Sequence, residues 1–432
     1  MAAIRHPVVI IGGGLTGLSA AIHLKHPYVL VEREKELGGL ARTEKRNGYC
    51  FDITGHWLHL RDSGVESLVK KLLGPNLVEI QRVSRVYSNG TFVRYPFQGN
   101  LYGLPPNVIY ECLSGYFQTL LNRDREPPRN FEQFIFHHFG AGIARHFMIP
   151  YNTKLWGVHP REITSAWCQR FVPIPTPEQV VAGAVGANPP ELGYNIRFFY
   201  PRHGGIQTLS DALAARLDQK QVRLSSMAEE IDPEKQTVVI GGERISYRAL
   251  ISTMPLPLLV KALRNAPKEI IEAGAQLRAM PVRYLNVATR TPAPSKYHWV
   301  YVPEERLPFY RVGIFSNAVP SMAPPGCSSL YVELADRNSV QDEGETIRDV
   351  LSALVEVQAI SSVDDVVFAD LREIDFAYVI YDKNYEAALG CIAPYLESRH
   401  IYSRGRYGAW TYSAMEESLL VGQEVAQKVN EL

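Results

Sequence analysis

Three closely spaced glycines near the start of the chain could hold the phosphates of a nucleotide. They lie in the stretch Gly12-Gly13-Gly14-Leu15-Thr16-Gly17, directly after the apolar residues 8–11. In such a turn Gly12 allows a sharp change of direction, Gly14 lets the backbone approach a phosphate, and Gly17 lets a helix pack closely on a strand. Amides at the helix N-terminus then face the anion. This pattern predicts a dinucleotide pyrophosphate site. A glycine-rich turn in a βαβ unit of another kind is the alternative, because it could show the same glycine spacing.

The residues after this turn indicate which dinucleotide is bound. A second apolar run, residues 28–31, ends at Glu32, about 20 residues after Gly12, where an acid that binds ribose hydroxyls is expected. A further glycine pair follows in Gly38-Gly39-Leu40-Ala41-Arg42. Large flavoenzymes place such a pair beside the pyrophosphate and ribityl chain of FAD. We therefore expect FAD, with Glu32 and residues 38–42 contributing to its site.

The elements that must position these residues suggest an interleaved α/β protein. Residues 8–24 and 28–32 predict strand, turn, helix and strand, as in a Rossmann-like domain. Apolar residues at helical spacing over 131–148 predict an inserted helical domain, and alternating stretches between 283 and 379 predict an antiparallel sheet. We expect a discontinuous FAD-binding domain (1–85, 201–270 and 390–432), a mainly helical substrate domain (100–200), and an antiparallel sheet domain (86–99 and 271–389).

Composition narrows the classes of partner. The 432 residues contain 45 basic and 45 acidic side chains, so there is no surplus of positive charge for nucleic acid or anionic membranes. No apolar run approaches the length of a membrane span, and residues 1–7 lack the apolar segment of a signal peptide. The five cysteines are scattered without a C-x-x-C pair, which favours reduced thiols and predicts no metal site. We expect a cytoplasmic enzyme; the oligomeric state stays open, a homo-oligomer included.

Several longer strings resemble those of the UDP-galactopyranose mutase family, particularly its eukaryotic branch. The similarity runs over nearly the whole chain, whereas the glycine motifs alone are shared with amine oxidases, phytoene desaturases and protoporphyrinogen oxidases. The strings are Gly48-Tyr49 with Phe51–His56, Tyr95-Pro96-Phe97-Gln98, Pro150–Trp156, Pro308-Phe309-Tyr310-Arg311 and Ser403–Trp410.

The resemblance implies a flavin-dependent isomerase, a mutase in which reduced FAD acts as a nucleophile. In that family flavin N5 attacks the anomeric carbon, the nucleoside diphosphate departs, and the sugar recloses, so that UDP-galactopyranose and UDP-galactofuranose interconvert for cell-surface polysaccharide biosynthesis. The substrate is a nucleotide sugar, and another hexose or a GDP- or dTDP-linked sugar stays open. NADPH is a candidate reductant, as is a separate reductase.

Carried over by position, the resemblance gives roles to a set of polar residues. Arg290 and Arg406 match the arginines that clamp the diphosphate, a task suited to a bidentate, permanently charged guanidinium. Tyr378 and Tyr412 match tyrosines that bond the diphosphate. Arg170 corresponds to an arginine of the loop beside the sugar, and Asn195 to an asparagine on the same loop. A surface or structural ion-pair role is the alternative for both clamp arginines.

The resemblance also predicts the nucleobase pocket and the flavin edge. Tyr95 and Phe97 would enclose the base, Gln98 and Asn152 would bond its polar edge, and Trp156 would lie near the ribose or sugar; an ordinary aromatic core is the alternative. The Gly55-His56 turn would pass beside the flavin ring, where glycine makes a backbone rearrangement easy.

Three classes of function follow from these residues. The first is the flavin-dependent mutase. The second is an FAD-dependent oxidoreductase like the amine oxidases or protoporphyrinogen oxidases, which would need few cations at the flavin. The third is a flavoprotein that binds or assembles without turnover. The arginines and the nucleotide-pocket strings favour the mutase.

Overall fold

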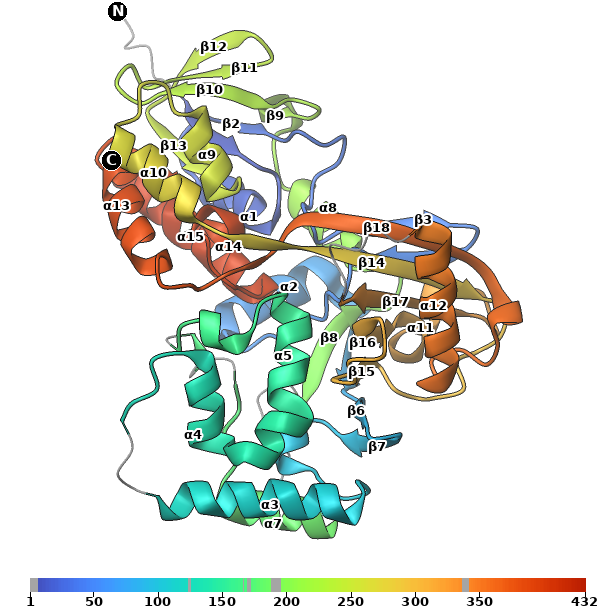
Figure 1. Cartoon of the computed structure of the whole chain (residues 1–432). Helices are drawn as coiled ribbons and strands as arrows, with labels where there is room; N and C mark the ends of the chain where they lie inside the picture. Colours follow the sequence, from blue (N-terminus) through green and yellow to red (C-terminus); the bar gives the residue numbers. More distant parts are fainter. Residues whose placement is uncertain (1–6, 123–125, 166, 169–171, 188–195, 336–341) are drawn as a thin grey trace, which may run out of the picture.

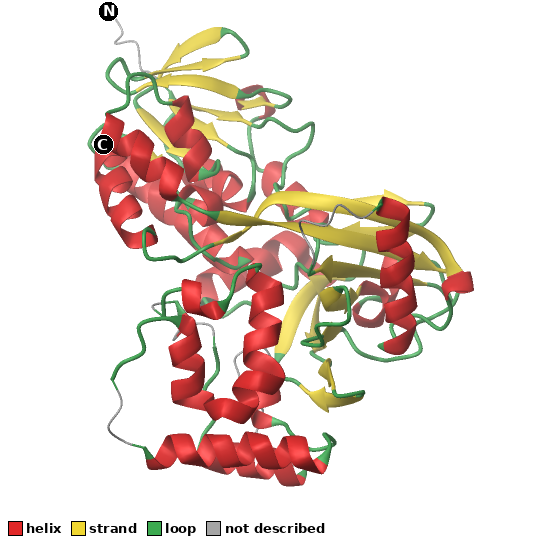
Figure 2. Ribbon diagram, viewed as in Figure 1, coloured by secondary structure: helices red, strands yellow, loops and turns green. Residues whose placement is uncertain are grey.

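The computed structural model describes residues 7–122, 126–165, 167–168, 172–187, 196–335 and 342–432. Figures 1 and 2 show three parts: a sheet flanked by helices that contains both ends of the chain, a second large sheet, and a helical region opposite the first part. The predicted α/β class is confirmed. Arg170 and Asn195 lie outside the described residues.

The first part is a five-stranded, all-parallel sheet. The β-branched run Val8–Ile11 is completely buried and forms the central strand β1, as expected for a sheet covered on both faces. The strand order is β19-β13-β1-β2-β9. In that order the strands span Ile401–Ser403, Ala249–Ser252, Val8–Ile11, Tyr28–Val31 and Val222–Arg223.

Helices cover this sheet and tie the two ends of the chain together. The small residues of α1 (Leu15–His23) allow close packing against α15 (Met415–Asn430): a Cβ at Gly422 would lie 2.4 Å from the Thr16 carbonyl oxygen. The other helices of this part are α2 (Ser63–Leu73), α8 (Gln207–Ala214), α9 (Leu256–Ala262), α10 (Lys268–Gln276), α13 (Tyr385–Glu397) and α14 (Gly405–Gly408). The small sheet β10-β11-β12 (Ala228–Asp232, Thr237–Ile240, Glu243–Ser246) lies beside it.

The second part is a seven-stranded sheet with the order β18-β14-β17-β16-β15-β6-β7. It is mixed rather than purely antiparallel, because β15 pairs with β6 in parallel. In that order its strands span Val366–Val379, Ala279–Thr289, Ser328–Leu334, Phe309–Ile314, Trp299–Tyr301, Ser84–Ser88 and Thr91–Arg94. Helices α11 (Phe315–Ala318) and α12 (Glu343–Glu356) belong to the same part.

The helical part is formed by α3, α4, α5 and α7 (Pro106–Leu121, Phe131–Ile143, Ile149–Trp156, Pro177–Val185). Gly140 and Gly142 let α4 cross α3 closely, since a Cβ at either would lie 2.2 Å from a backbone oxygen of α3. The predicted helix over 131–148 is α4 followed by a π-helical turn, Ala144–Met148, that leads into α5. Such turns often occur at functional sites.

Two ribbons and several short turns complete the described chain. The ribbons are β3-β4 (Thr43–Arg46, Tyr49–Asp52) and β5-β8 (Leu77–Gln81, Arg197–Pro201). The 3-10 turns are Gly74–Asn76, Phe97–Gly99, Pro160–Glu162, Gln219–Gln221, Pro320–Met322 and Val363–Asp365. Among the described residues, no helix has the length and apolar character needed to cross a membrane.

Candidate active site

A continuous cavity of about 1070 Å³ extends across all three parts of the molecule. Its lining runs from the glycine turn after β1 and the end of β2, past the 53–57 segment, to α5, β16 and the segment 405–418. A volume of this size is at the upper end of cofactor and substrate sites.

At one end the cavity is shaped by backbone. Gly12 has φ 101°, and a Cβ there would collide with Thr253, so the turn requires glycine. Gly17 is excluded from carrying a side chain because its Cβ would lie 2.0 Å from the Gly12 carbonyl oxygen. These contacts agree with the turn and packing roles predicted for the two residues; Gly17 itself does not line the cavity.

Gly14 differs from these two glycines. A Cβ there would meet nothing closer than the Gly39 Cα at 3.8 Å, yet Gly14 and Gly39 both line the cavity. Space for a side chain is therefore present, and it is the space that a pyrophosphate at the N-terminus of α1 would fill. The arrangement fits a dinucleotide.

Glu32 lines the cavity at the same end as Gly12 and Gly14. Its side chain is only 7% exposed; one carboxylate oxygen accepts the Gly13 amide at 2.7 Å and the other accepts the Glu34 amide at 2.9 Å. Each oxygen retains a lone pair for a ribose hydroxyl. The predicted residues 38–42 also line the cavity, so the structure brings together Gly12, Gly14, Glu32 and this segment.

The Gly55-His56 turn lies at the middle of the cavity. Gly55 has a steric reason to be glycine, since a Cβ there would lie 2.1 Å from the Tyr331 hydroxyl and 2.8 Å from the Trp299 ring. Burial, with smaller contributions from the charges of Arg406 and Arg311, lowers the pKa of His56 to about 4. His56 is therefore neutral at pH 7.

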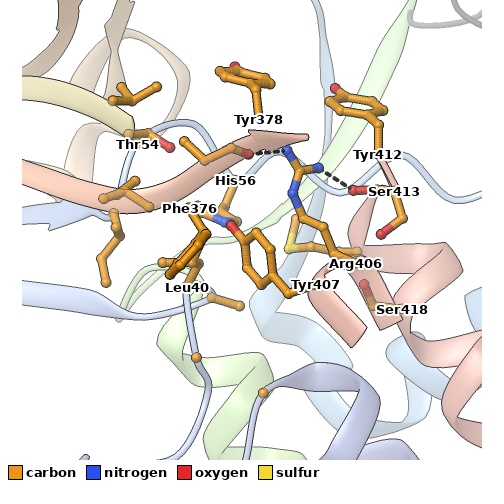
Figure 3. A pocket seen from close by; sticks show the side chains of 18 of the residues that line it. Leu40, Thr54, His56, Phe376, Tyr378, Arg406, Tyr407, Tyr412, Ser413 and Ser418 are labelled. Atoms are coloured by element: carbon orange, nitrogen blue, oxygen red, sulfur yellow. Dashed lines mark hydrogen bonds between the residues drawn. The ribbon is translucent and has the colours of Figure 1, made fainter. Parts of the chain in front are cut away.

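Arg406 is the main cation beyond this turn (Figure 3). Its guanidinium donates to the carbonyl oxygens of Ser413 and Ala377, both at 2.8 Å, and lies 4.6 Å from the ring centroid of Tyr412 and 5.8 Å from that of Tyr378. Within the described part of the chain, no carboxylate forms an ion pair with it. A partly buried cation held by carbonyls and aromatic rings is suited to an incoming anion.

Arg311 is a second buried cation that the sequence interpretation left without a role. It extends from β16 into the cavity and forms a bidentate ion pair with Glu333 of β17, with contacts of 2.7 Å. Arg311 also donates to the Tyr378 hydroxyl at 3.0 Å. Burial raises the pKa of Tyr378 to about 12, so that this phenol is a neutral donor.

The structure does not bring Arg290 to this site. Arg290 follows the last residue of β14, is exposed, and is not among the cavity-lining residues; its amide donates to the Asp365 carbonyl. Arg311, unlike Arg290, lines the cavity, where it contacts Tyr378. The available signal was the string Pro308-Phe309-Tyr310-Arg311 together with an acid on a neighbouring strand, but the pairing of Arg311 with Glu333 depends on sheet register.

The far end of the cavity is aromatic. Tyr95, Gln98, Asn152 and Trp156 all line it, as predicted. Phe97 does not: it is completely buried behind Phe147, whose ring it stacks on at 5.0 Å. Phe147, from the π-helical turn, lines the cavity and also stacks on Tyr151, with ring centroids 5.1 Å apart.

Polar groups at this end are held in defined orientations. Gln98 donates through Nε2 to the Pro173 carbonyl at 2.9 Å, and its Oε1 is buried with no hydrogen-bond partner in the described residues. Asn152 donates to the Met148 carbonyl at 2.7 Å. A free amide oxygen beside aromatic rings can accept from the polar edge of a base. In the described residues no cluster of His, Cys, Asp and Glu could hold a metal ion.

The fold and the glycine-lined end of this cavity are typical of dinucleotide-binding enzymes, and a second compartment of the same cavity contains the side chains of Arg311 and Arg406. The model of the family "Flavin containing amine oxidoreductase" matches residues 15–430, and the chain belongs to this family. A curated relative, "Probable flavin-containing monoamine oxidase A" of Dictyostelium discoideum, is 24% identical over 353 residues, covering 74% of this chain and 70% of the relative.

Solved structures show the same architecture. The crystal structure of a reduced UDP-galactopyranose mutase superposes with a TM-score of 0.92 at 29% identity, over 99% of this chain and 94% of the other. Cyclohexylamine oxidase from Brevibacterium oxydans has the same fold, with a TM-score of 0.67 at 17% identity over 99% of both chains. The protein is thus a flavin enzyme similar to UDP-galactopyranose mutase, and the family and this structure support FAD as its cofactor.

Proposed function

We propose that the protein is a flavin-dependent mutase that interconverts the pyranose and furanose forms of a nucleotide sugar, with UDP-galactopyranose as the first candidate. The observation that carries the proposal is the partly buried guanidinium of Arg406, which faces the cavity between aromatic rings with no carboxylate partner in the described residues. A diphosphate would supply the missing negative charge.

The cavity offers a place for each part of such a substrate. The base would lie by Tyr95 and Phe147, with Gln98 Oε1 accepting from its polar edge. The diphosphate would lie by Arg406 and Arg311, with Tyr378 and Tyr412 as donors. Trp156 and Asn152 line the space between these groups.

The sugar would then lie against the flavin, beside Gly55 and His56. Reduced FAD would supply the nucleophile, N5, at the anomeric carbon. The protein's part is to stabilise the departing diphosphate: the C–O bond breaks with its electron pair on the diphosphate oxygen, and Arg406 stabilises that charge until the same oxygen returns. Electrons are not consumed overall. His56, being neutral, does not compete for the anion.

An amine oxidase activity is the alternative, supported by the Dictyostelium relative. Arg406 weighs against it, because this cation lines the cavity with no carboxylate partner in the described residues, and a small apolar amine would supply none. NADPH as reductant, a cytoplasmic location and a homo-oligomer remain part of the proposal.

A panel of sugar nucleotides separates the two activities. The dithionite-reduced protein is incubated anaerobically with UDP-galactopyranose and then with other UDP-, dTDP- and GDP-hexoses, and products are resolved by anion-exchange chromatography. We expect a furanose product from reduced protein and almost none from oxidised protein. Oxygen uptake with amines, together with no sugar product anywhere in the panel, would overturn the proposal.

A further inference from the structure

One buried lysine lies just outside the cavity and joins two of its walls. Lys154 belongs to α5 and its side chain is 9% exposed. Its ammonium donates to three backbone carbonyls, those of Glu304 at 2.5 Å, Phe309 at 2.7 Å and Val302 at 3.3 Å. Val302 and Glu304 lie in the segment that connects β15 to β16, and Phe309 is the first residue of β16.

The elements that Lys154 connects carry most of the nucleotide-sugar compartment. Tyr151, Asn152 and Trp156 line the cavity from α5, on either side of Lys154 in the sequence. Tyr301 lines it from β15 and Arg311 from β16. The rings of Tyr151 on α5 and Tyr301 on β15 are also in contact, with centroids 5.7 Å apart.

The chemistry of the contact favours a charged lysine. Three carbonyl oxygens match the three N–H donors of an ammonium group, whereas a neutral amine has only two. Burial lowers the pKa of Lys154 to about 7; Glu304 and Glu305 favour the charged form and Arg306 disfavours it. Loss of the proton therefore leaves Lys154 with one donor too few for these three carbonyls.

We infer that Lys154 is a positioning residue, which sets the distance between α5 and the β15–β16 hairpin and so the shape of the compartment for the base and diphosphate. The inference rests on the proposed function. It also accounts for the spacing in this part of α5: Lys154 contacts the hairpin, while Tyr151, Asn152, Leu155 and Trp156 line the cavity.

The test compares Lys154→Met, Lys154→Arg and, as a matched control, Lys268→Met, which removes an exposed lysine on α10. Each holoprotein is titrated in its oxidised state with UDP-galactopyranose. We expect Lys154→Met to retain FAD and to bind roughly tenfold more weakly or worse, because hydrogen bonds to a buried charge are lost. Lys154→Arg should recover part of the affinity, and Lys268→Met should equal the parent.

Turnover and pH distinguish positioning from general destabilisation. Lys154→Met should raise KM roughly tenfold with kcat changed less than about threefold, since Arg406 stays in place. In the parent, affinity should fall as the pH rises from about 6 to about 8.5, and in Lys154→Arg it should stay constant, because a guanidinium keeps its charge. Unchanged affinity in Lys154→Met, or no pH dependence in the parent, would overturn the inference.

Amide hydrogen exchange keeps this result separate from the proposed function. Lys154→Met should exchange faster than the parent over residues 302–309, whatever ligand the protein binds. If the parent bound no sugar nucleotide, the proposed function would be wrong. Hydrogen exchange would still measure whether Lys154 stabilises residues 302–309. An unchanged exchange rate over residues 302–309 in Lys154→Met would show that Lys154 does not stabilise this segment.

Discussion

The two ends of the cavity are built in different ways. At the dinucleotide end, the walls are largely backbone, shaped by Gly12, Gly14 and Gly39 within one short stretch of chain. At the opposite end, the walls include large side chains from many separate segments, with Arg311 and Arg406 almost 100 residues apart. A backbone site can be recognised from local sequence, whereas a side-chain site depends on how distant segments pack.

The largest effect should come from the side-chain end, at Arg406. Arg406→Ala should lower kcat/KM for the sugar nucleotide by about two to three orders of magnitude, within the roughly 2–5 kcal/mol expected for removing one partner of a buried charged pair. Arg406→Lys should recover only part, because an ammonium lacks the planar fork. Steady-state kinetics on flavin-loaded protein measure both.

Arg290→Ala is the matched control for this arginine. Arg290 is exposed and lies outside the cavity, so its loss should leave kcat/KM near the parental value. A large loss in Arg290→Ala, with Arg406→Ala close to the parent, would reverse the assignment made from the structure.

The backbone end should respond through the cofactor. Gly14→Val places methyl groups in the space that a pyrophosphate would fill, so the FAD content of purified protein should fall roughly tenfold, while Gly390→Val, at a helical glycine with nothing within 4 Å, should retain its flavin. The ratio of flavin to protein absorbance gives the result. Full occupancy in Gly14→Val would mean that the phosphates lie elsewhere.

The last prediction concerns the pH dependence of stability, through a buried carboxyl between the two ends. Asp52 ends β4, just before Gly55-His56, and accepts from Thr43, Tyr200 and the Ile206 amide. Burial raises its pKa to about 7 against these hydrogen bonds. Because the unfolded state loses this proton at lower pH, stability should fall as the pH rises from about 4 to about 7, by at most about 1.4 kcal/mol per pH unit.

Asp52→Asn should remove this part of the pH dependence, since an amide does not titrate. Urea unfolding of parent and variant at several pH values makes the comparison. An equal slope in both proteins would show that Asp52 is ionised throughout this range.

The sequence predicted the dinucleotide end more completely than the substrate end, for a physical reason. The contact that requires Gly17 is with Gly12, inside one βαβ unit, and the φ of 101° at Gly12 belongs to the same turn, although the side chain that a Cβ of Gly12 would strike is that of Thr253. Within such a unit, spacing along the chain determines spacing in space. Arg290 and Arg311 both follow or lie in apolar strands, and only the register of β16 against β17 places one of them beside Glu333 in the cavity. The residue pattern within either strand does not indicate the register between the two strands.

The aromatic wall illustrates the same limit. Tyr95 and Phe97 flank a proline in one string, yet Tyr95 lines the cavity and Phe97 lies behind Phe147. The π-helical turn that carries Phe147 shifts the helical spacing at that point, so an ordinary helical pattern does not indicate which side chain faces the cavity. The sequence does not indicate the contacts of Lys154, because its partners are backbone carbonyls, which every residue has.

The most direct test of the account is the number of turnovers per reducing equivalent. The flavin is reduced once, under anaerobic conditions and without excess reductant, and UDP-galactopyranose is added in large excess over enzyme. The account predicts that many furanose molecules form per flavin while the flavin spectrum returns to the reduced state. Reoxidation of the flavin with one product per cycle, or no furanose at all, would contradict it.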